Sequence, residues 1–137
     1  MVYIYPAIFT PDEIEGRGDV YTVDIPDISG CITEGESIEE AISMAREAIA
    51  GCILAMKQAG EHIPAPSNYN DMKMKIMLDR EFVTLIDVDL NDYLRKKETK
   101  SVIKTVSLPQ WLAIMAEEAG ISYSQALQET LKDRLGL

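Results

Sequence analysis

The sequence has little of several features that mark particular protein classes. Its 137 residues include only two cysteines, Cys31 and Cys52, too few for a disulfide framework and outside any metal-ligand spacing. No stretch approaches the roughly 18 consecutive apolar residues that a membrane-spanning helix needs. The first residues, MVYIYPAIF, lack the basic start and the small-residue cleavage site of a secretory signal. We expect a cytoplasmic protein whose cysteines are small, buried, reduced groups.

Histidine is scarcer still, since His62 is the only one. A histidine can act as a general base, but no nucleophilic serine or cysteine stands beside this one in the sequence. The proline two positions later is typical of a loop. We interpret His62 as a surface loop residue.

Acidic residues are abundant and unevenly distributed. The chain has 13 basic and 23 acidic residues, a net charge of −10. Residues 1–90 contain six basic against 17 acidic residues, whereas residues 91–137 contain seven against six. Five of those basic residues fall within 95–104, RKKETKSVIK. An acidic body repels nucleic acid and a basic segment attracts phosphate, so the pattern predicts two parts with two partners.

The first third of the chain alternates between strand and turn patterns. Val2–Phe9 is rich in β-branched and aromatic residues and predicts a strand, with Pro6 at a bulge or on an unpaired edge. Thr10–Asp19 has a turn composition, and Val20–Ile25 alternates like a half-buried strand. Cys31–Thr33 predicts a third, short strand. Short turns between successive strands favour an antiparallel meander.

A helix and a fourth strand are predicted to follow. Ser37 and Glu40 have the spacing of a capping box, and Gly60 marks the helix end. Phe82–Leu90 predicts a strand apolar enough to lie inside a sheet. The order β-β-β-α-β places the helix on one face of a four-stranded sheet. Its apolar stripe is expected at Ile38, Ile42, Ala45, Ile49, Cys52 and Met56.

The remaining residues predict a linker and a small tail. Asn91–Lys100 is polar, a hinge or a frayed helix, and Ser101–Leu108 predicts a strand with no partner strand after it. Pro109 fits a helix start, Gly120 stops that helix, and Ser122 caps the next one. The two helical stripes are Leu112, Met115, Ala116 and Ala119, and Tyr123, Leu127, Leu131 and Leu135.

This tail of about 37 residues is too short to bury a core alone. Its lone strand also leaves backbone donors and acceptors unpaired. A second copy solves both problems, so we predict an obligate homodimer with a two-stranded antiparallel ribbon and four helices. Such a ribbon fits the major groove of DNA. A plain dimerisation tail with a solvated basic linker is the alternative.

Two parts of the sequence resemble a known family. Tyr21–Ala41, YTVDIPDISGCITEGESIEEA, and Ile63–Pro66, IPAP, resemble the N-terminal domain of HicB antitoxins. Lys104–Leu112 and Gly120–Gln128 are similar to the ribbon-helix-helix tail found in one branch of that family. The resemblance covers nearly the whole chain except residues 67–81 and 91–100.

The resemblance implies an α+β protein. It implies a partial ribonuclease H-like domain over residues 1–90, a linker over 91–100 and a ribbon-helix-helix domain over 101–137. The implied function is an antitoxin that occludes a HicA-like mRNA-cleaving ribonuclease and represses its own operon by binding operator DNA. HicA toxins are small and basic, so an acidic domain is a suitable partner. No cofactor is expected.

Two rival hypotheses stay open. One is a repressor whose acidic domain senses another ligand or protein. The other is a metal-dependent nuclease, because ribonuclease H chemistry gathers carboxylates around two divalent cations. Val2–Phe9 holds no acid, however, and alternation places Asp24, Asp87 and Asp89 at solvent-facing or partner-facing positions. We therefore predict no enzyme activity.

The candidate contact residues form two groups. Charge and position favour four acids for toxin contact: Asp24, Asp27, Glu34 and Glu36. In the ribbon, alternation directs Val106 and Leu108 inward and their neighbours toward the groove, where hydroxyls bond base edges and lysines meet phosphates. The first amides of the last helix would hold a phosphate. The candidate DNA contacts are Lys100, Ile103, Lys104, Thr105, Ser107, Ser122 and Ser124.

Overall fold

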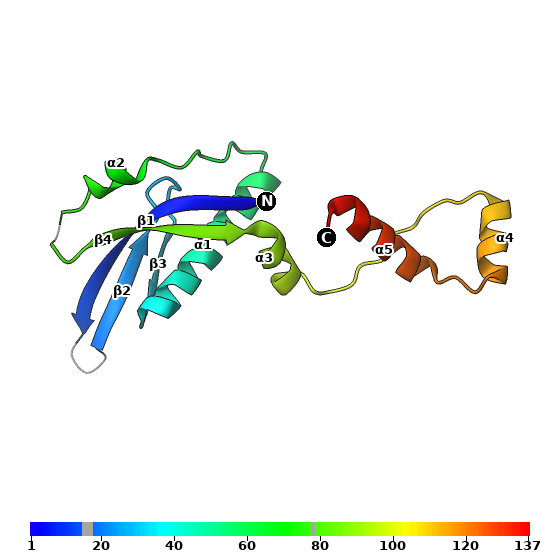
Figure 1. Cartoon of the computed structure of the whole chain (residues 1–137), viewed down its shortest axis with the longest axis horizontal. Helices are drawn as coiled ribbons and strands as arrows, with labels where there is room; N and C mark the ends of the chain where they lie inside the picture. Colours follow the sequence, from blue (N-terminus) through cyan, green and yellow to red (C-terminus); the bar gives the residue numbers. More distant parts are fainter. Residues whose placement is uncertain (15–17, 78) are drawn as a thin grey trace. The chain divides into compact units, whose positions relative to one another are not determined.

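The structure is a computed structural model that describes residues 1–14, 18–77 and 79–137. Those residues form two compact units, Met1–Thr99 (unit 1) and Lys100–Leu137 (unit 2). The described residues include four strands and five helices, which confirms the α+β class (Figure 1). Unit 1 contains β1 (Val2–Ile14), β2 (Gly18–Asp24), β3 (Ile32–Gly35), α1 (Ile38–Gln58), α2 (Tyr69–Lys73), β4 (Phe82–Asp89) and α3 (Leu90–Lys97).

The four strands form one antiparallel sheet in the order β3-β2-β1-β4. The predicted meander of the first three strands is confirmed. The prediction that Phe82–Leu90 lies inside the sheet is wrong, because β4 is an edge strand. Its apolar run is explained by helices on both faces: Ile86 and Val88 join the core beneath α1, and Val83 is buried outside that cluster.

Both prolines of β1 lie where this central strand has only one neighbour. β1 pairs with β4 over Val2–Phe9 and with β2 over Ile8–Ile14. Pro6 therefore has β4 alone beside it, which confirms the expected unpaired edge, and Pro11 has β2 alone. A proline lacks the backbone N–H, so it costs least where no ladder bond is made. The strand thus continues through the turn expected from Thr10 onward.

Helix α1 has the ends that the sequence predicted. The backbone N–H of Glu40 donates to Ser37 Oγ at 3.1 Å, and Gly60 adopts the left-handed conformation with φ 70°. The buried face differs from the predicted stripe, because Ile38 is 44% exposed. The buried residues are Ala41, Ala45, Ile49, Ala50 and Ile53. Small side chains on this face let the helix lie close to the sheet.

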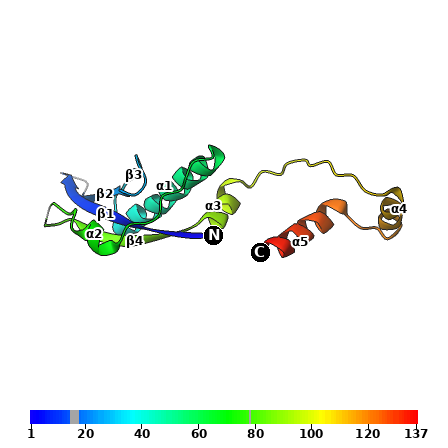
Figure 2. The same ribbon diagram turned by 90° about the horizontal axis from the view of Figure 1, so that it is seen from above.

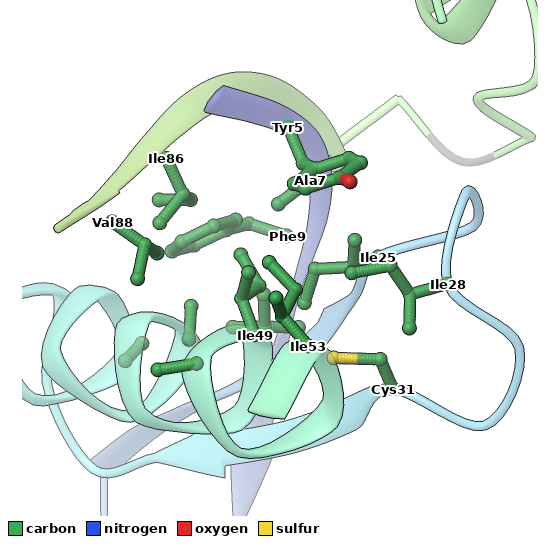
Figure 3. Packing of buried hydrophobic residues seen from close by; sticks show 14 of the residues in the cluster. Tyr5, Ala7, Phe9, Ile25, Ile28, Cys31, Ile49, Ile53, Ile86 and Val88 are labelled. Atoms are coloured by element: carbon green, nitrogen blue, oxygen red, sulfur yellow. The ribbon is translucent and has the colours of Figure 1, made fainter. Parts of the chain in front are cut away.

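The core of unit 1 fills the space between α1 and the sheet. Figure 3 shows Phe9 of β1 and Ile49 and Ile53 of α1 pointing toward one another. Cys31, at the start of the β3 segment, closes one side of this cluster and is 1% exposed. The other labelled members are Tyr5, Ala7, Ile25, Ile28, Ile86 and Val88.

The polar stretch 67–81, where no element was predicted, contains α2. This helix lies on the sheet face opposite α1 (Figures 1 and 2). Its Met72 is fully buried, and the Tyr69 hydroxyl donates to the Val83 carbonyl oxygen at 3.2 Å. The sheet is therefore covered on both faces near Val83.

Residues 91–97, expected as a hinge or frayed helix, belong to α3, which packs against α1. Unit 2 contains α4 (Gln110–Glu118) and α5 (Tyr123–Leu135), separated by Gly120 with φ 69°. The predicted cap is present, since the N–H of Gln125 donates to Ser122 Oγ at 3.3 Å. The predicted strand at Ser101–Leu108 is not formed in the single chain. A lone strand has no partner for its backbone groups.

Among the described glycines of unit 1, Gly35 leaves the least room for a side chain. A Cβ there would lie 2.4 Å from the backbone nitrogen of Ala41, where α1 meets β3. We expect Gly35→Ala to lower the free energy of unfolding by about 1–3 kcal/mol, the usual cost of overpacking. Urea unfolding measures this change.

Gly51→Ala is the matched control. Its Cβ would meet only the Tyr93 hydroxyl oxygen, at 3.7 Å, within a helix that favours alanine. This variant should be neutral or more stable by up to about 1 kcal/mol. Equal destabilisation by both substitutions would contradict the close helix–sheet contact at Gly35.

Candidate functional site

The four acids predicted for toxin contact lie around the β2–β3 side of unit 1. Asp24 and Glu34 lie on the sheet face opposite α1, as the pairing of Thr22 with Glu34 shows. Asp27 lies in the turn between β2 and β3, and Glu36 immediately precedes the N-cap of α1. Glu34 and Glu36 are exposed, whereas Asp24 and Asp27 are half-buried.

Asp24 is the most perturbed of these carboxyls. It faces Ile8 on one neighbouring strand and Ile32 on the other. Burial among these groups raises its pKa, and the positive charge of Lys75 partly opposes that rise. An apolar surrounding disfavours the charged carboxylate. Asp24 therefore adds a costly charge to this surface, which a cationic partner would stabilise.

Asp27 connects the turn between β2 and β3 to the loop before α2. Its carboxylate accepts a hydrogen bond from the Ser67 backbone N–H at 2.9 Å and another from the Ser67 hydroxyl. Three residues before Ser67, the carbonyl oxygen of Pro64 accepts a hydrogen bond from the Tyr5 hydroxyl at 2.5 Å. These bonds fix the proline-containing loop before α2. The structure thus gives Asp27 a positioning role that the sequence did not reveal.

The carboxylates weighed for metal catalysis do not converge. Asp24 lies on β2, while Asp87 and Asp89 lie on β4, two strands away. Asp87 is paired with Arg46, whose Nη2 lies 2.9 Å from Oδ1, and this bond lowers the Asp87 pKa. Among the described residues, no three Asp, Glu, His or Cys side chains form a group that could hold a metal ion.

His62 lies at the surface of unit 1, and the two cysteines lie in or against its core. His62 is exposed, on a shallow groove with Tyr3, Pro64 and Pro66. Burial and the neighbouring Cys52 thiol raise the pKa of Cys31 to about 12, so Cys31 is a neutral thiol. Cys31 is buried as predicted, whereas Cys52 is only half-buried.

The candidate DNA contacts in unit 2 are open to solvent. Lys100, Ile103, Lys104, Thr105 and Ser107 lie in a segment without helix or strand, and Ile103 is 96% exposed. At α5, Ser122 Oγ already accepts the capping bond, and Ser124 Oγ accepts one from the Gln128 amide at 3.1 Å.

Unit 2 has no core of its own. All of its residues are described, and none is buried. Its helical stripes are mostly exposed instead, with Leu131 at 48%, and Trp111, beside the first stripe, is 63% exposed. Apolar surface of this extent is normally covered by another molecule. The other exposed apolar residues are Val102, Val106, Leu108, Leu112, Ile114, Met115, Ile121, Tyr123, Leu127, Leu135 and Leu137.

The family comparison agrees with this arrangement. The family described as HicB-like antitoxin of bacterial toxin–antitoxin system matches residues 5–130, across both units. The chain belongs to the HicB-like antitoxin family. No helix among the described residues of this HicB-like antitoxin is long and apolar enough to cross a membrane.

Solved structures of HicB proteins share the fold. A chain of a toxin–antitoxin complex from Streptococcus pneumoniae is 27% identical, with a TM-score of 0.61, over 98% of this chain and 99% of that one. The antitoxin HicB of Burkholderia pseudomallei is 25% identical, with a TM-score of 0.53, over 97% and 96% of the two chains. Its N-terminal domain alone is 30% identical over 64% of this chain and all of that one, with a TM-score of 0.53.

A phage protein is also related by sequence. A 14.9 kDa protein from the rep-hol intergenic region of Haemophilus phage HP1 is 36% identical over 86 residues. The match spans 62% of this HicB-like antitoxin and 64% of the phage protein, slightly less than two thirds of each.

Asp24 should make the stability of this HicB-like antitoxin depend on pH. Because its folded pKa is raised, the protonated form favours folding, and that contribution is lost as pH rises from the unfolded value of about 3.9 through the folded pKa. Asp24→Asn removes the charge. We expect the variant's stability, relative to the wild type, to be higher at pH 7 than at pH 3 in urea unfolding.

Asp87→Asn provides a control of opposite sign. Arg46 lowers the Asp87 pKa, so its charged form stabilises the fold above the unfolded pKa, and the substitution should cost more at pH 7 than at pH 3. If the stability of both variants relative to the wild type changed in the same direction between pH 3 and pH 7, the assigned surroundings of Asp24 would be wrong.

Proposed function

We propose that this protein neutralises a HicA-like mRNA-cleaving ribonuclease by covering it with unit 1, and represses its own operon through unit 2. The observation that carries the proposal is the family match across both units. One solved relative that covers nearly the whole chain comes from a toxin–antitoxin complex, which supports a toxin as the partner. We place this work in the cytoplasm, where the toxin would meet mRNA.

Inhibition would require no catalysis by the antitoxin. Unit 1 has a complete core, a strongly acidic composition and no carboxylate cluster for a metal among its described residues. Such a surface is suited to binding a basic protein, because opposite charges speed association and disfavour wrong partners. Occlusion of the toxin's active site is then sufficient.

Repression would require two copies of the chain. In the proposed dimer, residues 101–108 of each copy pair into an antiparallel ribbon, and the exposed stripes of α4 and α5 pack into a shared core. Thr105 and Ser107 then face the bases, with Ile103 in reach of a thymine methyl. Lys100 and Lys104 would meet phosphates, and Ser122 and Ser124 would flank a phosphate at the start of α5.

The two activities should separate at the unit boundary. Removing residues 100–137 should leave inhibition of a purified HicA-type toxin, because the core of unit 1 stays complete. It should abolish operator binding and dimerisation. An RNA-cleavage assay, an operator gel shift and sedimentation analysis measure these three properties. Loss of toxin inhibition together with DNA binding would contradict the division.

Substitutions within the proposed ribbon test operator binding separately from dimerisation. Thr105→Ala with Ser107→Ala should weaken operator binding while keeping the dimer, since each base contact is worth about 1–3 kcal/mol. Val106→Asp should abolish both, because Val106 has the inward parity and a buried unpaired charge is costly. Unchanged operator affinity for the alanine variant would remove these hydroxyls from base recognition.

A further inference from the structure

The sheet of unit 1 has two outer edges, which differ in how far side chains cover their backbone groups. Strands β4 and β3 are each paired on one side only. The outer side of an edge strand presents backbone donors and acceptors that an extended segment of another protein can pair with. What covers each edge therefore decides where a partner strand can add.

The edge at β4 is already occupied by side chains. The Val83 carbonyl oxygen accepts a hydrogen bond from the Tyr69 hydroxyl of α2, and the Asp87 carbonyl oxygen accepts one from Arg46 Nε of α1, both at 3.2 Å. Because alternate residues direct their backbone groups to the same side, Leu85 also faces outward. An incoming strand would have to displace side chains from both faces of the sheet.

The edge at β3 is open. The N–H of Ile25 donates to the Cys31 carbonyl oxygen at 3.0 Å, so Cys31 faces β2. Alternation then directs Thr33 and Gly35 toward β2 and directs Ile32 and Glu34 outward. The Ile32 N–H donates a hydrogen bond to the Gly30 carbonyl oxygen at 3.1 Å. The Ile32 carbonyl and both backbone groups of Glu34 have no partner among the described residues.

The surroundings of this edge indicate the chemistry of its partner. Ile32 is 62% exposed on the strand, beside the exposed carboxylate of Glu34. Residues 18–45 contain seven acidic residues and no lysine or arginine. An extended segment that carries basic and apolar side chains would be complementary in charge and would cover Ile32.

We propose that the toxin adds an extended, basic segment to the outer edge of β3 and so extends the sheet by one strand. This inference rests on the proposed antitoxin function and names the surface that performs it. The added strand pairs with the backbone of Glu34 and with the Ile32 carbonyl, while the neighbouring carboxylates bind its basic side chains.

A second copy of the chain does not suit the same edge. Pairing two β3 strands would bring Glu34 and Glu36 of both copies to one junction. Like charges on neighbouring strands destabilise a sheet. The acidic composition therefore favours a basic partner over self-association.

The test separates backbone pairing from charge. Glu34→Pro removes the outward N–H and leaves the bonds of Thr33 and Gly35 to β2 in place, which an edge strand tolerates. We expect toxin affinity to fall about tenfold or more, the effect of an unsatisfied buried hydrogen bond. Glu34→Gln keeps the N–H and should weaken binding only a few-fold, and less at high salt. Leu85→Pro, on the blocked edge, is the control and should bind within about twofold of wild type, because outward prolines are tolerated there.

Calorimetric titration with a purified HicA-type toxin gives these affinities, and circular dichroism checks the fold of each variant. Should Glu34→Pro not fold, hydrogen exchange of the unaltered full chain answers the same question. The Glu34 amide should exchange rapidly in the free protein and slowly in the complex, whereas Thr33 and Gly35 should be protected in both.

Each outcome is decisive. If the wild-type chain does not bind the toxin, the proposed function fails and this inference with it. If the wild-type chain binds but Glu34→Pro binds equally well, or the Leu85 amide becomes protected instead, only the β3 edge is excluded. Concentration-dependent dimerisation of the wild type that Glu34→Pro abolishes would assign the edge to a second copy.

Discussion

The close contact between α1 and the sheet is the constraint on which unit 1 depends. Gly35 and Ala41 bring the start of the helix against β3, and Ala45 and Ile49 continue the buried face of the helix over the sheet. Most of the large apolar side chains of the core lie in this one layer, whereas Met72 and Val83 are buried on the opposite sheet face. Because β3 is paired with β2 alone, its outer edge is not needed to hold this layer and is available to the proposed partner.

Unit 2, in contrast to unit 1, has no buried apolar layer of its own. Its helix α5 has a side-chain cap at Ser122 and both helices end at left-handed glycines, yet none of the apolar side chains of unit 2 is buried. Caps are worth about 1 kcal/mol each, which cannot offset the conformational entropy of ordering some forty residues. Helical order in this unit therefore depends on apolar burial against another molecule. In the proposed dimer the second copy supplies this burial, and operator binding would then depend on assembly of the two chains.

Local signals in the sequence predicted local structure well. The caps at Ser37 and Ser122 and the left-handed glycines at Gly60 and Gly120 depend on neighbours a few residues away. Strand order, the exact buried face of α1 and the bond between Asp27 and Ser67 depend on contacts some forty residues apart or more. The apolar run of β4 led to the prediction of an interior strand. An edge strand that is covered by a helix on each face has the same apolar composition as a strand inside the sheet. The family resemblance supplied the function, which no single spacing could.

The distribution of charge explains why the two proposed activities are compatible on one chain. Unit 1 carries nine basic and nineteen acidic residues, and unit 2 carries four of each. Acidic unit 1 repels DNA, and in unit 2 only Lys104 lies in the proposed ribbon, with Lys100 just before it, so a single chain has little attraction for phosphate. Two chains double those cations and align the two ribbons, whereas a basic partner on unit 1 cancels the repelling charge. Binding of the toxin should therefore strengthen DNA binding by the dimer through electrostatics alone.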